Sequence, residues 1–111
     1  MVIGFDGADT NGVRPAVNGG GRPTLLVFGS ATSGPSRRVE GFVAQVLQRR
    51  QNHSTFELRY LDMAAHSQLA RRLAIVQIPT IVVVEDGRVR VRIEQPRGAA
   101  EIRTALTPWL R

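Results

Sequence analysis

The segment Ser33-Gly34-Pro35-Ser36 carries two hydroxyl groups with a glycine and a proline between them. Serine is a preferred residue at the start of a helix, because its side-chain oxygen accepts a hydrogen bond from a free N–H of the first turn. We therefore expect Ser33 to cap a helix; direct contact between its hydroxyl and a ligand is the alternative. Gly34 and Pro35 are expected to shape the turn and the first helical residues.

The other reactive side chains form no pattern typical of a hydrolytic site or a metal site. The chain has no cysteine, which excludes disulfides, thiolate metal ligands and cysteine nucleophiles. His53 and His66 have no second ligand at metal-binding spacing, and Asp62 is a lone carboxylate at the end of a predicted strand. We expect no metal, no cofactor and no catalytic residue in the sequence as it stands.

The hydrophobic pattern predicts the elements that position the serine segment. The apolar run Thr24–Phe28 predicts a strand that is buried on both faces. Apolar residues within 39–47 recur at helical spacing and predict a helix over about 34–51. The Asp86-Gly87 pair predicts a hairpin between the last two strands. Further predicted elements are strands over 56–62, 81–85 and 88–93 and helices over about 66–74 and 99–110.

The predicted order β-α-β-α-β-β-α indicates an α/β domain. Strands joined through helices are expected to run parallel or nearly so, with right-handed crossovers, and the last pair to run antiparallel. In the last strand, Val89, Val91 and Ile93 are expected to share one face, because alternate residues of a strand point to the same side. The run Val2–Phe5 could add an edge strand.

These motifs together resemble the thioredoxin family. Thioredoxins carry Cys-Gly-Pro-Cys where this chain has Ser33–Ser36, and they have the same Ile-Pro-Thr as Ile78-Pro79-Thr80 before the next apolar strand. The resemblance covers about residues 23–110. It implies a thioredoxin fold, with a mixed central sheet of four or five strands flanked by helices on both faces. It also implies that Pro79 is cis and that the backbone of Ile78 pairs with an extended peptide.

The resemblance also shows what this chain lacks. Thiol–disulfide exchange needs a thiolate nucleophile and a second thiol that resolves the mixed disulfide, and serine supplies neither. Val27 stands where thioredoxins bury an aspartate, and Gly29 and Thr32 stand where tryptophans flank their motif. Thiol–disulfide exchange is therefore chemically excluded for this sequence.

The sequence predicts a thioredoxin-like domain without redox cysteines that binds extended peptide or protein segments, in a groove between the Ser33–Ser36 loop and Pro79. The alternative is a thiol–disulfide oxidoreductase of the thioredoxin type, serving cell redox homeostasis, seen with its cysteines replaced by serine; its parent would be a protein-disulfide reductase. The residues expected to form the binding groove are Thr32, Ser33, Gly34, Pro35, Ser36, Gln77, Ile78, Pro79 and Thr80.

The length and composition of the chain predict its domain organisation and its location in the cell. The 111 residues suffice for one domain, expected over 23–111, and the glycine-rich residues 1–22 are expected to form a flexible arm. With no long apolar run and no visible secretory leader, a cytoplasmic protein without a membrane partner is expected.

The net charge is +6, and all fifteen basic residues are arginine. Arginine pairs such as Arg49-Arg50 and Arg71-Arg72 are expected to be solvated helix faces. Nucleic acid is not favoured as a partner, because no aromatic residues are interleaved with the arginines. A protein or peptide partner is expected instead, with binding of an anion or nucleic acid by the arginine surfaces as a third and weaker alternative.

Overall fold

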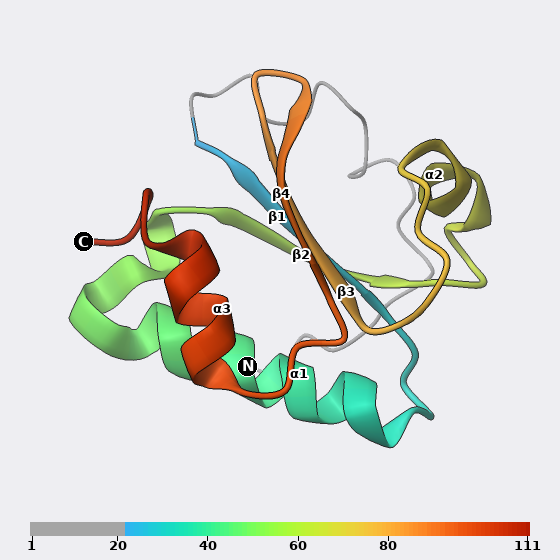
Figure 1. Ribbon diagram of the computed structural model, residues 1–111, viewed down its shortest axis with the longest axis horizontal. Coiled ribbons are helices and arrows are strands. Elements are labelled where there is room, and N and C mark those ends of the chain that lie inside the picture. The colour runs from blue at the N-terminus through green and yellow to red at the C-terminus, as the bar shows by residue number, and fades with distance from the viewer. Residues whose placement is uncertain (1–21) are drawn as a thin grey trace.

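The computed structural model describes residues 22–111. Within this range, four strands form one mixed sheet in the order β2-β1-β3-β4, with helices on both faces (Figure 1). The elements are β1 Thr24–Gly29, α1 Gly34–Gln48, the 3₁₀ segment η2 Arg49–Ser54, β2 Glu57–Asp62, α2 Ser67–Arg72, β3 Thr80–Glu85, β4 Arg88–Glu94 and α3 Ala99–Leu106. Apart from Arg22, the expected arm, with its possible edge strand at Val2–Phe5, lies outside the described residues.

Strand β1 lies inside the sheet and supplies the core on both faces. All six of its residues are buried, as its continuous apolar run predicted. Leu25 and Val27 pack on the face covered by α1 and α3, whereas Leu26 and Phe28 pack on the face covered by α2. Full burial of such a side chain contributes about 1.5–3 kcal/mol. The hydrophobic effect therefore fixes β1, and with it the start of the loop that carries the serines.

The direction of β3 corrects the expectation of parallel strands. Strand β1 pairs parallel with β2 but antiparallel with β3. Asp62, the last residue of β2, pairs with Gly29, and Thr80, the first of β3, pairs with Phe28. The last residue of β2 and the first residue of β3 therefore lie at the same end of the sheet. The connection through α2 therefore starts and finishes at the same end of the sheet, and β3 runs antiparallel to β1.

A β-bulge corrects the expected face of Val89. The pairing of β3 with β4 shifts between Val83 and Val84, so that Val83 pairs with Val91 and Val84 pairs with Val89. Val84 packs on the α2 face, whereas Val83 packs on the α1 and α3 face. The extra residue breaks the strict alternation of the strand. Val89 consequently leaves the face of Val91 and is 41% exposed.

Two helices end earlier than their sequence pattern predicted. α1 stops at Gln48, because Arg50 and Gln51 adopt left-handed φ values of 53° and 56° that redirect the chain toward β2. α3 stops at Leu106, two residues before Pro108, whose nitrogen cannot donate a helical hydrogen bond. Both ends lie on the same side of the sheet, where α1 and α3 pack together.

Candidate functional site

The loop after β1 places Ser33 at the start of α1. The Ser33 residue has extended backbone angles, and its Oγ accepts a hydrogen bond from the Ser36 N–H at 3.2 Å. Its carbonyl accepts from the Arg37 N–H at 3.1 Å. Proline in the first turn suits the helix, because the missing N–H would have no partner there. The predicted capping role of Ser33 therefore agrees with its geometry.

Ser36 supports the same loop from inside. Its side chain is 0% exposed, and its Oγ accepts a hydrogen bond from the Ser30 N–H at 3.1 Å. The Ser33 N–H in turn donates to the Ser30 carbonyl at 3.1 Å. Within residues 22–111, neither serine hydroxyl bonds to a histidine or a carboxylate that could serve as a general base. The two hydroxyls therefore stabilise the loop.

The segment before β3 lies on the other side of the site. The Ile78–Pro79 peptide bond is cis. Thr80 Oγ1 donates to the Gln77 carbonyl at 2.7 Å, and the Gln95 N–H donates to the Pro79 carbonyl at 2.7 Å. Among the described residues, the backbone N–H groups of Gln77 and Ile78 have no hydrogen-bond partner.

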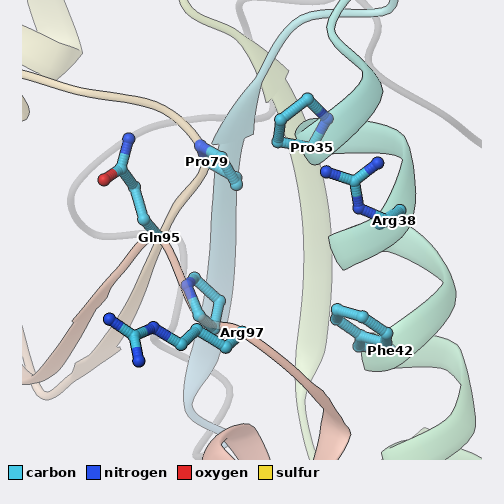
Figure 2. Close-up of a pocket in the computed structure, with 7 residues that line it drawn as sticks. Pro35, Arg38, Phe42, Pro79, Gln95 and Arg97 are labelled. Atoms are coloured by element: carbon cyan, nitrogen blue, oxygen red, sulfur yellow. The ribbon is translucent and has the colours of Figure 1, made fainter.

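A pocket of about 340 Å³ lies between the first turns of α1 and the Pro79 segment (Figure 2). Pro35, Arg38 and Phe42 project from α1 on one side, and Pro79 and Gln95 lie opposite. The full lining is Pro35, Arg38, Phe42, Pro79, Gln95, Pro96 and Arg97. No lining residue is acidic, so the pocket combines apolar surface with two arginine side chains.

The pocket contains only two of the residues expected from the sequence, Pro35 and Pro79. Thr32, Gly34 and Gln77 are exposed at its margin. Ser33 and Ile78 are half-buried, whereas Ser36 and Thr80 are buried and support the site from inside.

Sequence reasoning missed the contribution of 95–97 and of Arg38 and Phe42. The strand break at Pro96 was visible in the sequence, but its position beside α1 depends on the antiparallel pairing of β4.

Known proteins resemble this chain in both sequence and fold. The thioredoxin family model matches residues 11–108, which is nearly the whole chain. The chain belongs to the thioredoxin family. Thioredoxin from Mycolicibacterium smegmatis is 27% identical over 94 residues, which cover 85% of this chain and 84% of that protein. The family assignment and the α/β fold predicted from the sequence are therefore confirmed.

The fraction of each relative that this chain spans differs among the other relatives. The bifunctional thioredoxin reductase/thioredoxin of Mycobacterium leprae (strain TN) is 26% identical over 81 residues, which are 73% of this chain but only 17% of that protein. The solution structure of reduced desulfothioredoxin from Desulfovibrio vulgaris Hildenborough superposes with a TM-score of 0.78 at 18% identity. It covers 97% of this chain and 99% of that chain, which shows that the fold is shared.

The family's thiol chemistry has no counterpart in these side chains. The chain contains no cysteine. Val27, at the position of the thioredoxin aspartate, is fully buried in the apolar cluster under α1. Residues 22–111 hold no group of three or more side chains suited to a metal ion. No helix in the same range has the length and apolar character that a membrane crossing requires.

Proposed function

We propose that this thioredoxin-like domain binds extended segments of partner proteins without thiol–disulfide exchange. The observation that carries the proposal is a pocket beside two backbone N–H groups that have no partner among the described residues. The N–H groups of Gln77 and Ile78 have no partner among residues 22–111, and Pro79 lines the pocket beside them. An extended chain can pair with such a backbone edge while one of its side chains enters the pocket.

The lining of the pocket supports a particular partner chemistry. Phe42 and the three prolines offer apolar surface, and Arg38 projects toward the gap from α1 (Figure 2). Because a guanidinium group pairs well with a carboxylate, an acidic residue next to an apolar one fits this pocket best. Val76, which is 79% exposed two residues before Ile78, extends the apolar surface along the same segment.

The proposal is tested with a cysteine-blocked, extended peptide. Nuclear magnetic resonance titration of the full chain with S-carbamidomethylated insulin B chain should shift the amide signals of residues 32–38, 76–80 and 95–97. A Gly34→Leu variant should weaken the binding by about tenfold, because the added side chain projects toward Arg38 at the pocket margin.

Gly41→Leu is the matched control for this experiment. Gly41 is exposed in the same helix, and a Cβ atom there meets no atom within 4 Å. This variant should bind the peptide as the parent chain does. Equal weakening by both variants, or shifts outside the three named segments, would contradict binding in the groove.

The redox alternative is tested by restoring both sulfur atoms. The Ser33→Cys/Ser36→Cys variant should reduce insulin disulfides well below the rate of an ordinary thioredoxin, because Val27 provides no carboxylate to accept a proton. The measurement is the rate of insulin precipitation with a chemical reductant as electron source. A rate equal to that of thioredoxin would favour an oxidoreductase ancestry for the site over a dedicated binding role.

A further inference from the structure

A second pocket lies at the other end of α1, away from the groove. It has a volume of about 370 Å³, and four of its lining residues are arginines: Arg49, Arg50, Arg103 and Arg111. They come from three parts of the chain, namely η2, α3 and the C-terminal residues. Figure 1 shows the segment after α1 beside the C-terminal end of the chain. The fold therefore brings the Arg49-Arg50 pair, which the sequence predicted to lie on a solvated helix face, together with two further arginines.

These arginines form no ion pair with an acidic side chain of residues 22–111. No residue lining the pocket is aspartate or glutamate. The ion pairs within residues 22–111 are Arg59 with Glu57 and Arg90 with Glu85, and neither involves the pocket. Like charges gathered at one site repel each other, so the pocket favours a ligand of opposite charge. Guanidinium groups match phosphate oxygens with paired hydrogen bonds.

Asn52 holds the arginine-bearing segments together. Its side chain is 2% exposed, and its Nδ2 donates to the Arg49 carbonyl at 2.7 Å. Its Oδ1 accepts from the Arg111 N–H at 2.9 Å and from Thr55 Oγ1 at 3.0 Å. One buried amide therefore fixes η2 to the C-terminal residues. This anchoring reduces the loss of conformational freedom that a ligand would otherwise cause.

The backbone of the pocket is also unusual. Arg50 and Gln51 are two successive residues with left-handed φ, although neither is glycine. Such conformations are strained for residues other than glycine, and they recur at ligand sites where the surrounding structure enforces them. The left-handed turn carries Arg50 into the lining of the pocket rather than onto a continuation of α1.

We propose that this pocket binds a small molecule bearing two or more phosphate groups. A volume of about 370 Å³ is within the range of small-molecule sites and exceeds what a single phosphate ion fills. Thr107 Oγ1 donates to the Arg103 carbonyl at 2.9 Å and keeps lone pairs, so a ligand hydroxyl can also bond there. Free polyphosphate and a nucleotide share this chemistry, and the experiment separates them.

Isothermal titration calorimetry of the full chain, at fixed ionic strength, tests the proposal with tripolyphosphate, ATP and citrate. Both phosphate compounds should bind, and citrate should bind at least about tenfold more weakly. Equal affinity for the two phosphate compounds indicates recognition of phosphate alone, whereas tighter ATP binding indicates that the nucleoside also makes contact. Absence of binding at about 1 mM, or citrate binding as tight as tripolyphosphate, would overturn the proposal.

Matched variants separate a built site from general charge attraction. Arg49→Gln/Arg103→Gln should weaken tripolyphosphate binding by about tenfold or more. The control, Arg71→Gln/Arg72→Gln, removes the same charge from exposed positions on α2 and should change affinity less than about twofold. Equal losses in both would overturn the proposal. Because Arg49 is exposed, the single Arg49→Gln and Arg71→Gln exchanges repeat the comparison if the double variant unfolds.

Discussion

At the residue scale, the hydroxyls of Ser33 and Ser36 accept backbone hydrogen bonds that cysteine thiols would accept only weakly. The Ser33 oxygen accepts from the Ser36 N–H, and the Ser36 oxygen accepts from the Ser30 N–H. A thiol sulfur is a weak acceptor, so the same loop with cysteines would lose much of this bonding. The replacement of sulfur by oxygen thus removes the redox couple and adds a network that fixes the loop.

The capping role of Ser33 leads to a stability prediction. Ser33→Ala should lower the free energy of unfolding by about 1 kcal/mol, because the Ser36 N–H loses its acceptor. Ser33→Asp should retain most of the stability, since aspartate also caps helices and its charge favours the helix N-terminus. Urea unfolding followed by Trp109 fluorescence measures both. If alanine proved harmless while aspartate destabilised the fold, the capping account would be wrong.

At the element scale, the sequence predicted the kind and order of the elements but not all of their relations. The apolar run of β1 and the Asp86-Gly87 hairpin appeared where expected. The direction of β3 depends on the end of the sheet at which the chain emerges from the short α2. No local sequence pattern encodes that position. The bulge opposite Val83 and Val84 likewise depends on how two strands twist against each other, so Val89 was assigned to the wrong face.

The candidate site shows the same division between local and tertiary information. The Ser33–Ser36 motif and Pro79 are recognisable as sequence, and both border the groove. Arg38 and Gln95 reach the pocket only because α1 packs beside the loop that follows β4. The grouping of Arg49 and Arg50 with Arg103 and Arg111, which are far apart in the chain, could not be predicted for the same reason. Residues that come together only through tertiary packing share no local sequence pattern that would predict their contact.

Gly41 offers a prediction that belongs to α1 as an element. Gly41→Ala should raise the free energy of unfolding by about 0.5–1 kcal/mol, because glycine in a helix interior loses more backbone entropy on folding. The position is exposed, and an added Cβ meets no atom within 4 Å. Denaturant midpoints of the two proteins at equal slope measure the effect. A loss of stability would mean that the helix is not continuous through residue 41.

At the scale of the whole molecule, α1 connects the two candidate sites. Its first turns line the groove, and its last turn contributes Val46 to the arginine pocket. Phe42 of the groove and Val46 of the arginine pocket lie about one helical turn apart, roughly 6 Å along the axis of α1. The position of α1 over the sheet therefore sets the geometry of both pockets. Tyr60 of β2 contacts the middle of this helix.

The contact of Tyr60 with α1 predicts how the stability of the molecule depends on alkaline pH. Tyr60 is buried, and its hydroxyl donates to the Glu40 carbonyl at 3.5 Å. Burial, and secondarily the charge of Glu40, raise the pKa of Tyr60 above its ordinary value. The unfolded chain then releases this proton first, so stability is complete below about pH 10 and falls by about 1.4 kcal/mol per pH unit above it.

Tyr60→Phe removes the ionisable group while keeping the ring, so its unfolding free energy should lack this decline above about pH 10. Because Tyr60 is the single tyrosine of the chain, tyrosinate absorbance reports its ionisation directly. Trp109, whose ring lies tilted against that of Phe56 with the centroids 6.2 Å apart, reports unfolding by its fluorescence. The absorbance and fluorescence changes should occur over the same pH range, because the buried Tyr60 ring can ionise readily only after α1 has separated from the sheet. Tyrosinate forming near pH 10 in a protein that stays folded would show that β2 and α1 separate without unfolding.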